Sequence, residues 1–313
     1  MNRSNPTPGP LISPPGRLCR CRFQSVSVTA SKLPERSIRC FYVASGQVLS
    51  QMQSTDLSKF HLLGVPVAAT NMDAAIHDVR SWIERGDRRR TVTFSNVHML
   101  VEGIRSPGYF EVLQKSDMNC PDGKPLVWYG RSKMGKRNVQ QVCGPEFLPA
   151  FCAATADLKL RHFFYGGAEG VAAKAAAMLQ KKIPSLEIAG VYSPPFRPLN
   201  AEEKEQVIQT INDSRPDVVW VCLGCPKQEA WIDEFKGRLD VPVLLAVGLA
   251  IDILAGTRDR APVFMRNLGL EWFYRFCQEP RRLWRRYLIY NSIFVYHVLA
   301  EKLLPAGRSG TKA

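Results

Sequence analysis

The chain lacks any apolar run long enough to cross a membrane. A spanning helix needs about 20 predominantly apolar residues. The longest candidate, Tyr287 to Leu299, is shorter and contains Asn291, Ser292 and His297. The N-terminal region also lacks the compact apolar segment of a secretory signal. We therefore expect neither a membrane-spanning helix nor a secretory signal.

Motifs for metals and nicotinamide cofactors are also missing. No Asp-x-Asp pair is present, and Cys222-x-x-Cys225 has no second pair at zinc spacing. Gly166 to Gly170 is a poor version of the G-x-G-x-x-G fingerprint, so a nicotinamide-dependent oxidoreductase is a disfavoured alternative. The nine cysteines are scattered and odd in number. Without a secretory signal, this pattern indicates reduced thiols in the cytosol.

Acidic residues are scarce at both ends of the chain. The net charge is +14. Residues 1–55 carry seven Lys or Arg against one acid, and residues 257–313 carry eleven against four. The segment between them is nearly neutral. Clustered positive charge suggests an anionic partner: nucleic acid, an anionic membrane or a phosphorylated substrate. Because the central segment is nearly neutral and carries no recognition motif, we expect no nucleic-acid partner.

Composition and pattern divide the chain into three parts. Residues 1–55 are rich in Arg, Ser and Pro, as is typical of a transit peptide, and are predicted to be a disordered basic extension. Alternatively, this extension is an over-long start, since Met52 directly precedes the patterned region. Residues 56–256 are predicted to form an α/β domain, and residues 257–313 a basic helical appendage.

The central part alternates short apolar runs with helical patterns. This alternation predicts a Rossmann-like parallel sheet with helices on both faces. The predicted strands are Arg90–Ser95, Leu160–Tyr165, Leu186–Tyr192, Val218–Leu223 and Val243–Val247, with Leu62–Val67 as a strand or turn. The predicted helices include Met72–Glu84 with Asn71 as its N-cap, one starting at Val97, Gly170–Lys182, Ala201–Ser214 and Trp231–Lys236.

From Val263 to Leu304 the pattern is helical throughout. Arginines are interleaved with bulky aromatic residues, a combination that suits a membrane interface. The alternative is a helix packed on the sheet with solvated arginines. We expect peripheral attachment to an anionic membrane surface, on the cytoplasmic side.

The stretch Val219 to Trp231, VWVCLGCPKQEAW, resembles the signature of the WecG/TagA/CpsF glycosyltransferases. Its buried strand ends at Gly224, and Lys227, Gln228 and Glu229 crowd the following turn, where open α/β sheets bind ligands. Five further segments resemble family motifs in the same order. They are Cys120–Gly123, Gly248–Gly256, Arg260–Pro262, Gly269–Arg275 and Pro280–Arg285. The resemblance extends from about residue 62 to residue 286.

The resemblance implies an inverting, metal-independent transfer of an N-acetylmannosamine-type sugar. The donor would be a UDP-sugar and the acceptor a polyprenyl-diphosphate-linked sugar, with no cofactor. UDP-glucose or UDP-glucuronate as donor, and a catalytically weakened membrane scaffold, remain open, as does a homo-oligomer. Asp122 matches the family's base, and a carboxylate can take the proton from the attacking hydroxyl. The alternative is that this aspartate only shapes its turn.

The same resemblance implies a set of substrate-binding residues. Asn96 ends a strand, and Asp252 is placed to bind a sugar hydroxyl or to cap its own segment. The predicted ligands are Asn96, Lys227, Gln228, Asp252, Arg275, Arg282 and Arg285. The spacing of the three arginines places them near one face of a single helix, where they can stabilise a leaving diphosphate.

Four further residues carry predictions of their own. Glu229 is expected to brace its turn, and His98 is either a second proton carrier or a structural residue. The chain departs from the family at Phe94, where Thr is common, and at Gln141, where Arg is common. Arg137 is a candidate to compensate for Gln141.

Overall fold

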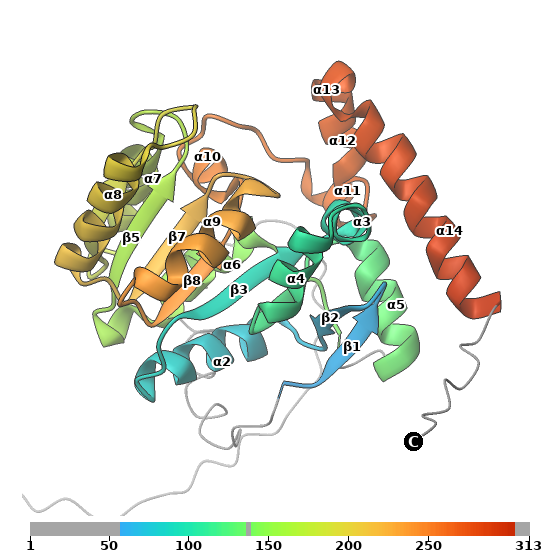
Figure 1. The fold of residues 1–313 in the computed structure, drawn as a ribbon, viewed down its shortest axis with the longest axis horizontal. Coiled ribbons are helices and arrows are strands. Elements are labelled where there is room, and N and C mark those ends of the chain that lie inside the picture. Colours follow the sequence, from blue (N-terminus) through green and yellow to red (C-terminus); the bar gives the residue numbers. More distant parts are fainter. Residues whose placement is uncertain (1–56, 136–138, 304–313) are drawn as a thin grey trace, which may run out of the picture. The chain divides into compact units, whose positions relative to one another are not determined.

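The computed structural model describes residues 57–135 and 139–303, all of which fall in one compact unit. The predictions for residues 1–55 and for Arg137 lie outside the described residues. The unit contains a six-stranded parallel sheet in the order β4-β3-β8-β7-β5-β6 (Figure 1). Its strands are β3 (Arg90–Ser95), β4 (Met118–Pro121), β5 (Arg161–Gly166), β6 (Glu187–Tyr192), β7 (Val218–Cys222) and β8 (Val243–Ala246).

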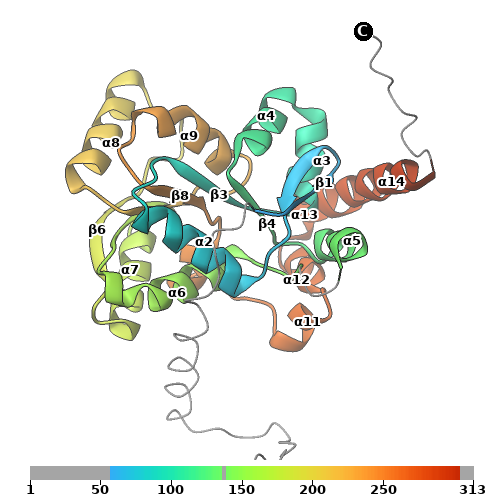
Figure 2. The same ribbon diagram turned by 90° about the horizontal axis from the view of Figure 1, so that it is seen from below.

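Helices cover both faces of this sheet (Figure 2). On one face lie α2 (Met72–Glu84), α6 (Gly144–Ala154), α7 (Val171–Lys182) and α10 (Ala250–Leu254). On the other lie α8 (Ala201–Ser214) and α9 (Lys227–Phe235), with α4 (Pro107–Lys115) packed on α9. Strands buried on both faces explain the continuous apolar runs of the sequence. The predicted α/β class is confirmed.

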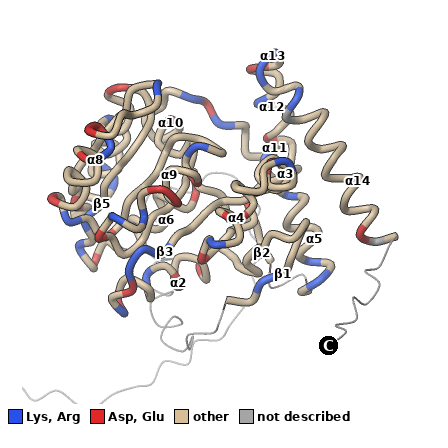
Figure 3. The backbone as a smooth tube through the Cα atoms, in the orientation of Figure 1, with Lys and Arg blue, Asp and Glu red and all other residues tan. Residues whose placement is uncertain are grey.

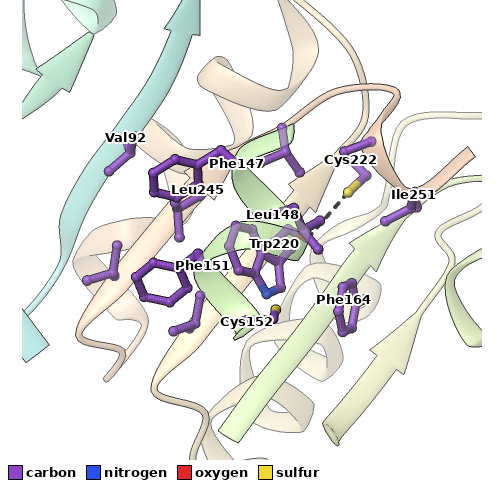
Figure 4. Packing of buried hydrophobic residues seen from close by; sticks show 14 of the residues in the cluster. Val92, Phe147, Leu148, Phe151, Cys152, Phe164, Trp220, Cys222, Leu245 and Ile251 are labelled. Carbon is purple, nitrogen blue, oxygen red and sulfur yellow. Dashed lines mark hydrogen bonds between the residues drawn. The ribbon is translucent and has the colours of Figure 1, made fainter. Parts of the chain in front are cut away.

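The core beneath the sheet is centred on Trp220 of β7. Its ring lies edge-on to Phe151 of α6 with centroids 5.8 Å apart, and Figure 4 shows Phe147, Leu148 and Cys152 around it. Its buried Nε1–H donates to Nδ1 of His162 at 3.1 Å. Burial lowers the pKa of His162 to about 4, so the imidazole accepts this hydrogen bond as a neutral ring.

A second core lies at the β4 end of the sheet. The hairpin of β1 (Lys59–Leu62) and β2 (Val65–Ala68) turns through Leu63 and Gly64, both at positive φ. It packs with α3 (Val97–Arg105), α4, α5 (Lys124–Met134) and Phe294 of the last helix. Gly130 of α5 lies against the hairpin so closely that a Cβ there would meet the Phe60 ring at 2.6 Å.

The helical pattern predicted from Val263 onward takes the form of several helices. Gly269, at φ +75°, separates α11 (Val263–Asn267) from α12 (Glu271–Gln278). Glu279, at φ −132° and ψ 61°, ends α12 because the residue before a proline is disfavoured in the helical region. α13 (Pro280–Trp284) then continues through a π-helical turn (Arg285–Ile289) into α14 (Tyr290–Leu303). Among the described helices, none is both long and apolar enough to span a bilayer.

Candidate active site

Two cavities lie at the carboxyl end of the sheet, as expected for ligand sites in open α/β folds. The larger, of about 1090 Å³, is lined by residues at the ends of β3, β4, β5, β7 and β8, and we call it the sheet-edge cavity. The smaller, of about 580 Å³, is lined by α5, by the segment from Arg260 to Arg275 and by α14. We call it the α5–α14 cavity. The two share Asn96, Asp122, Pro145 and Arg275.

Asp122 follows β4 directly and lies where the cavities meet. Its backbone N–H donates to Ser95 O at 2.9 Å, which ties it to the end of β3. Burial raises the pKa of its carboxyl group to about 7; Glu271 and Glu146 add to the rise, and Arg275 and Arg260 oppose it. A carboxylate with a pKa near the working pH suits general-base chemistry.

Asn96 lines both cavities and also caps a helix. Its Oδ1 accepts from Met99 N at 3.3 Å and caps α3, which fixes the side chain beside both cavities. Gly123 lies against its backbone, since a Cβ on that glycine would stand 3.6 Å from Asn96 Cα. The sequence therefore places Asn96 beside Asp122 through the parallel pairing of β3 with β4.

Lys227 and Gln228 begin helix α9 rather than lying in the turn before it. Lys227 is exposed and lines the sheet-edge cavity, as expected for a ligand of phosphate. Gln228 is buried, and its amide is fully hydrogen-bonded within the protein. Nε2 donates to Glu229 and to Ala246 O, while Oε1 accepts from Gly224 N and from Gly248 N. These bonds hold the loops around Gln228 in place; Gln228 also lines the sheet-edge cavity, and its contact with substrate stays a prediction.

The three arginines do not share one helix, contrary to the prediction. Arg275 lies on α12, Arg282 on α13 and Arg285 at the start of the π-helical turn, because the chain breaks at Glu279. Arg275 and Arg282 line the sheet-edge cavity. Arg285 lines neither cavity, and its guanidinium stands over the Trp284 ring at 5.2 Å.

Glu279 holds two cations at the rim of the sheet-edge cavity. Its carboxylate is 3.1 Å from Arg282 and 3.3 Å from Arg258. Arg258 in turn lowers the pKa of Asp252, although burial dominates and raises it overall. Asp252 lies on α10 and also lines this cavity, so the structure brings it to the same site as Lys227.

His98 lines the α5–α14 cavity near Asp122 but is engaged by other groups. Its ring stacks on Tyr290 of α14 with centroids 4.9 Å apart, and Cys225 Sγ lies 3.5 Å from its Nδ1. These contacts join α3 and α14 to the loop between β7 and α9, which favours the structural alternative. Glu229 is also buried, and it raises the pKa of nearby Tyr109 in addition to the larger effect of burial.

The two departures from the family have definite structural places. Phe94 is nearly buried and packs on Phe147 with centroids 5.2 Å apart. Gln141 donates from Nε2 to the backbone oxygen of Asp122 at 2.5 Å, so it holds the loop that carries the carboxylate. Both residues therefore support the site without supplying a charge.

Sequence reasoning gave no role to a cluster of charges beside Asp122. Arg260 and Arg266 both contact Glu146, at 3.0 and 2.6 Å, and Glu271 contacts Arg275 at 3.1 Å. Arg260 lies in a motif that was recognised, but its neighbour Glu146 is far away in the sequence. Within the described residues, no group of three or more His, Cys, Asp or Glu side chains is arranged to hold a metal.

Comparison with known proteins shows which family and which proteins the chain is similar to. The profile described as "Glycosyl transferase WecG/TagA/CpsF family" matches residues 60–308. Three similar proteins, from Bacillus spizizenii W23, Bacillus subtilis 168 and Staphylococcus aureus MW2, are each named N-acetylglucosaminyldiphosphoundecaprenol N-acetyl-beta-D-mannosaminyltransferase. The first is 32% identical over 63% of this chain and 74% of its own length. The second is 30% identical over 62% and 73%, and the third 24% identical over 80% and 96%.

Proposed function

Because the chain belongs to the WecG/TagA/CpsF family of glycosyltransferases, we propose that it transfers N-acetylmannosamine from a UDP donor. The acceptor is a polyprenyl-diphosphate-linked N-acetylglucosamine, as the names of the similar proteins suggest. One observation carries the proposal: a carboxyl group with a pKa of about 7 lies where two cavities meet. Such a group is placed to take a proton between two bound substrates.

The proposed reaction inverts the sugar in one step. The acceptor hydroxyl attacks the anomeric carbon of the donor, the bond from that carbon to the phosphate oxygen breaks, and UDP leaves. Asp122 takes the hydroxyl proton, and one base suffices because the sugar forms no bond with the protein. Lys227, Arg275 and Arg282 line the sheet-edge cavity and are proposed to bind the leaving diphosphate.

We also propose that the C-terminal helices rest on an anionic membrane at its cytoplasmic face. Large apolar side chains are exposed along them, including Trp272, Phe273, Trp284, Leu288 and Leu299. Figure 3 shows basic residues on α12 and α13, all of them arginines, while most of α14 carries no charge. Each basic residue near an anionic surface contributes about 1 kcal/mol, which gives reversible attachment. α14 also packs on α3. The C-terminal helices can therefore contact the sheet domain and the membrane at the same time.

The function is tested with a panel of UDP-sugars and a short-chain prenyl-diphosphate-linked N-acetylglucosamine. We expect release of UDP and a disaccharide-lipid product with UDP-N-acetylmannosamine. Turnover only with UDP-glucose or UDP-glucuronate would change the donor, and turnover with none of the sugars would contradict the proposal. Nuclear magnetic resonance of the product reports whether the anomeric configuration is inverted.

Transfer is expected to continue in EDTA. The chain has no Asp-x-Asp pair to hold a metal. Lys227, Arg275 and Arg282 at the sheet-edge cavity are placed to bind the diphosphate instead of a metal ion. The measurement compares initial rates with and without chelator after dialysis. A rate that collapses in EDTA and returns with Mn²⁺ or Mg²⁺ would contradict this prediction.

A further inference from the structure

The cations of the site fall into two groups on either side of Asp122. Lys227, Arg258 and Arg282 line only the sheet-edge cavity, while Lys124, Arg260 and Arg266 line only the α5–α14 cavity. Arg275 lines both. The proposed reaction likewise involves two diphosphates, one on the departing nucleotide and one on the lipid acceptor.

An inverting reaction separates those two diphosphates in space. The acceptor hydroxyl must approach the anomeric carbon from the side opposite to the departing phosphate, and two diphosphates held together would repel each other. The lipid diphosphate therefore needs its own cations. These cations must lie on the side of Asp122 that is away from the nucleotide. Resting on the proposed function, we propose that Arg260 and Arg266 bind the diphosphate of the lipid acceptor in the α5–α14 cavity.

The local charge balance favours an anion at this position. Arg260 and Arg266 share one carboxylate, that of Glu146, at 3.0 and 2.6 Å. Arg260 is also 3.7 Å from Glu271, but Glu271 lies closer to Arg275, at 3.1 Å. The Nε atoms of both arginines are buried and make no hydrogen bond within the described residues, and Arg260 also donates to Cys143 Sγ at 3.3 Å. Planar guanidinium groups suit phosphate oxygens.

The lining of this cavity also includes large apolar side chains. They are Trp128 and Tyr129 on α5 together with Phe294, Val295 and Val298 on α14. Trp128 is 60% exposed although it lines the cavity. A cavity lined by both cations and apolar side chains matches a phosphorylated amphiphile. The first prenyl units would then lie between α5 and α14.

The decisive variants are Arg266→Ala and Glu146→Gln. Both remove the Arg266–Glu146 ion pair, but only the first removes the cation. We expect Arg266→Ala to raise the KM for the prenyl-diphosphate acceptor about 10- to 100-fold, with the KM for the UDP-sugar unchanged. Glu146→Gln should leave the acceptor KM unchanged or lower it. An equal rise in acceptor KM for both variants would reduce Arg266 to a structural ion pair and overturn the inference.

An acceptor without phosphate shows whether Arg266 contacts the diphosphate or the sugar of the acceptor. With an alkyl glycoside of N-acetylglucosamine, wild type and Arg266→Ala should have the same acceptor KM. A loss of the same size on this acceptor would overturn the inference. Arg266→Lys keeps the charge but not the planar guanidinium group. Its KM for the prenyl-diphosphate acceptor should lie between those of wild type and Arg266→Ala. This variant also controls for a folding defect in the alanine variant.

Direct binding distinguishes failure of this inference from failure of the proposed function. Farnesyl diphosphate is titrated into wild-type protein saturated with UDP, with calorimetric detection. We expect binding in the presence of UDP and a 10-fold or larger loss in Arg266→Ala. Displacement of one ligand by the other would show a shared site and overturn the inference, while the assay of UDP-sugar transfer judges the function independently.

Discussion

Replacing Asp122 with asparagine is expected to lower kcat about 10²- to 10⁴-fold, the range for loss of a general base. Asparagine keeps the shape of the side chain but cannot take the proton of the acceptor hydroxyl. UDP binding, measured by calorimetry, should change little because the substitution keeps all three cations proposed to bind the diphosphate. Turnover within a few-fold of wild type would mean that Asp122 only shapes its turn.

The pH profile supplies an independent check on this residue. Because the base works only when ionised, kcat/KM should rise with pH and level off above the carboxyl pKa of about 7. The residual rate of the asparagine variant should lack this rise. A wild-type profile that is flat between pH 5 and 8 would contradict the assignment.

The same substitution should stabilise the fold at alkaline pH. The folded pKa of about 7 lies above the ordinary aspartate value of 3.8, so the unfolded chain releases the proton first as pH rises. The stability that the protonated group provides is complete below about pH 4 and is lost as pH rises through 7. Asparagine avoids this loss, which is on the order of 4 kcal/mol for a pKa raised from 3.8 to about 7. A higher Tm at pH 8, with little difference at pH 4, would confirm it.

Replacing Arg275 and Arg282 together with alanine is expected to lower the transfer rate about 10²- to 10⁴-fold. Loss of a single donor to developing charge costs about 10²- to 10³-fold in other enzymes, and both arginines line the cavity assigned to the donor. The assay uses detergent and a short-chain acceptor, so that membrane attachment does not enter.

Arg285→Ala is the matched control. It removes an arginine from the same C-terminal segment, but this side chain lines neither cavity and stands over Trp284. Its rate in detergent should stay within a few-fold of wild type, while its binding to anionic vesicles should weaken. Equal rate losses in the double variant and in Arg285→Ala would show that the arginines act through folding or through membrane attachment rather than at the leaving diphosphate.

Elements with complete local signals were predicted to the residue. β3 and α8 match their predicted bounds, and Asn71 caps α2 through a 3.0 Å bond to Ala74 N. Elements with conflicting local signals were missed. β4 contains Asn119 and ends at Pro121, and α6 contains Pro149, so propensity argued against both. Pairing with β3 and packing on Trp220 override those preferences.

The site divides in the same manner. Asn96 was found because it ends a strand and Asp122 because it matches the family's base, and the parallel pairing of β3 with β4 brings the two together. The structural role of Gln228 was not visible, because its partners at Ala246 and Gly248 are fixed only by the order of β7 and β8. The roles of Arg260 and Arg266 depend in the same way on Glu146, which folding alone brings near.

The four hydrogen bonds of Gln228 make two loops behave as one rigid piece. Its amide joins the loop after β7, which leads into Lys227, to the loop after β8, which leads into Asp252. Neither loop can shift without breaking a hydrogen bond to Gln228. Lys227 and Asp252, which both line the sheet-edge cavity, are therefore held at a set separation before any ligand arrives, and binding needs little ordering of either loop. The protein then discriminates between ligands of different size through the fixed distance between these two loops rather than by closing around the ligand.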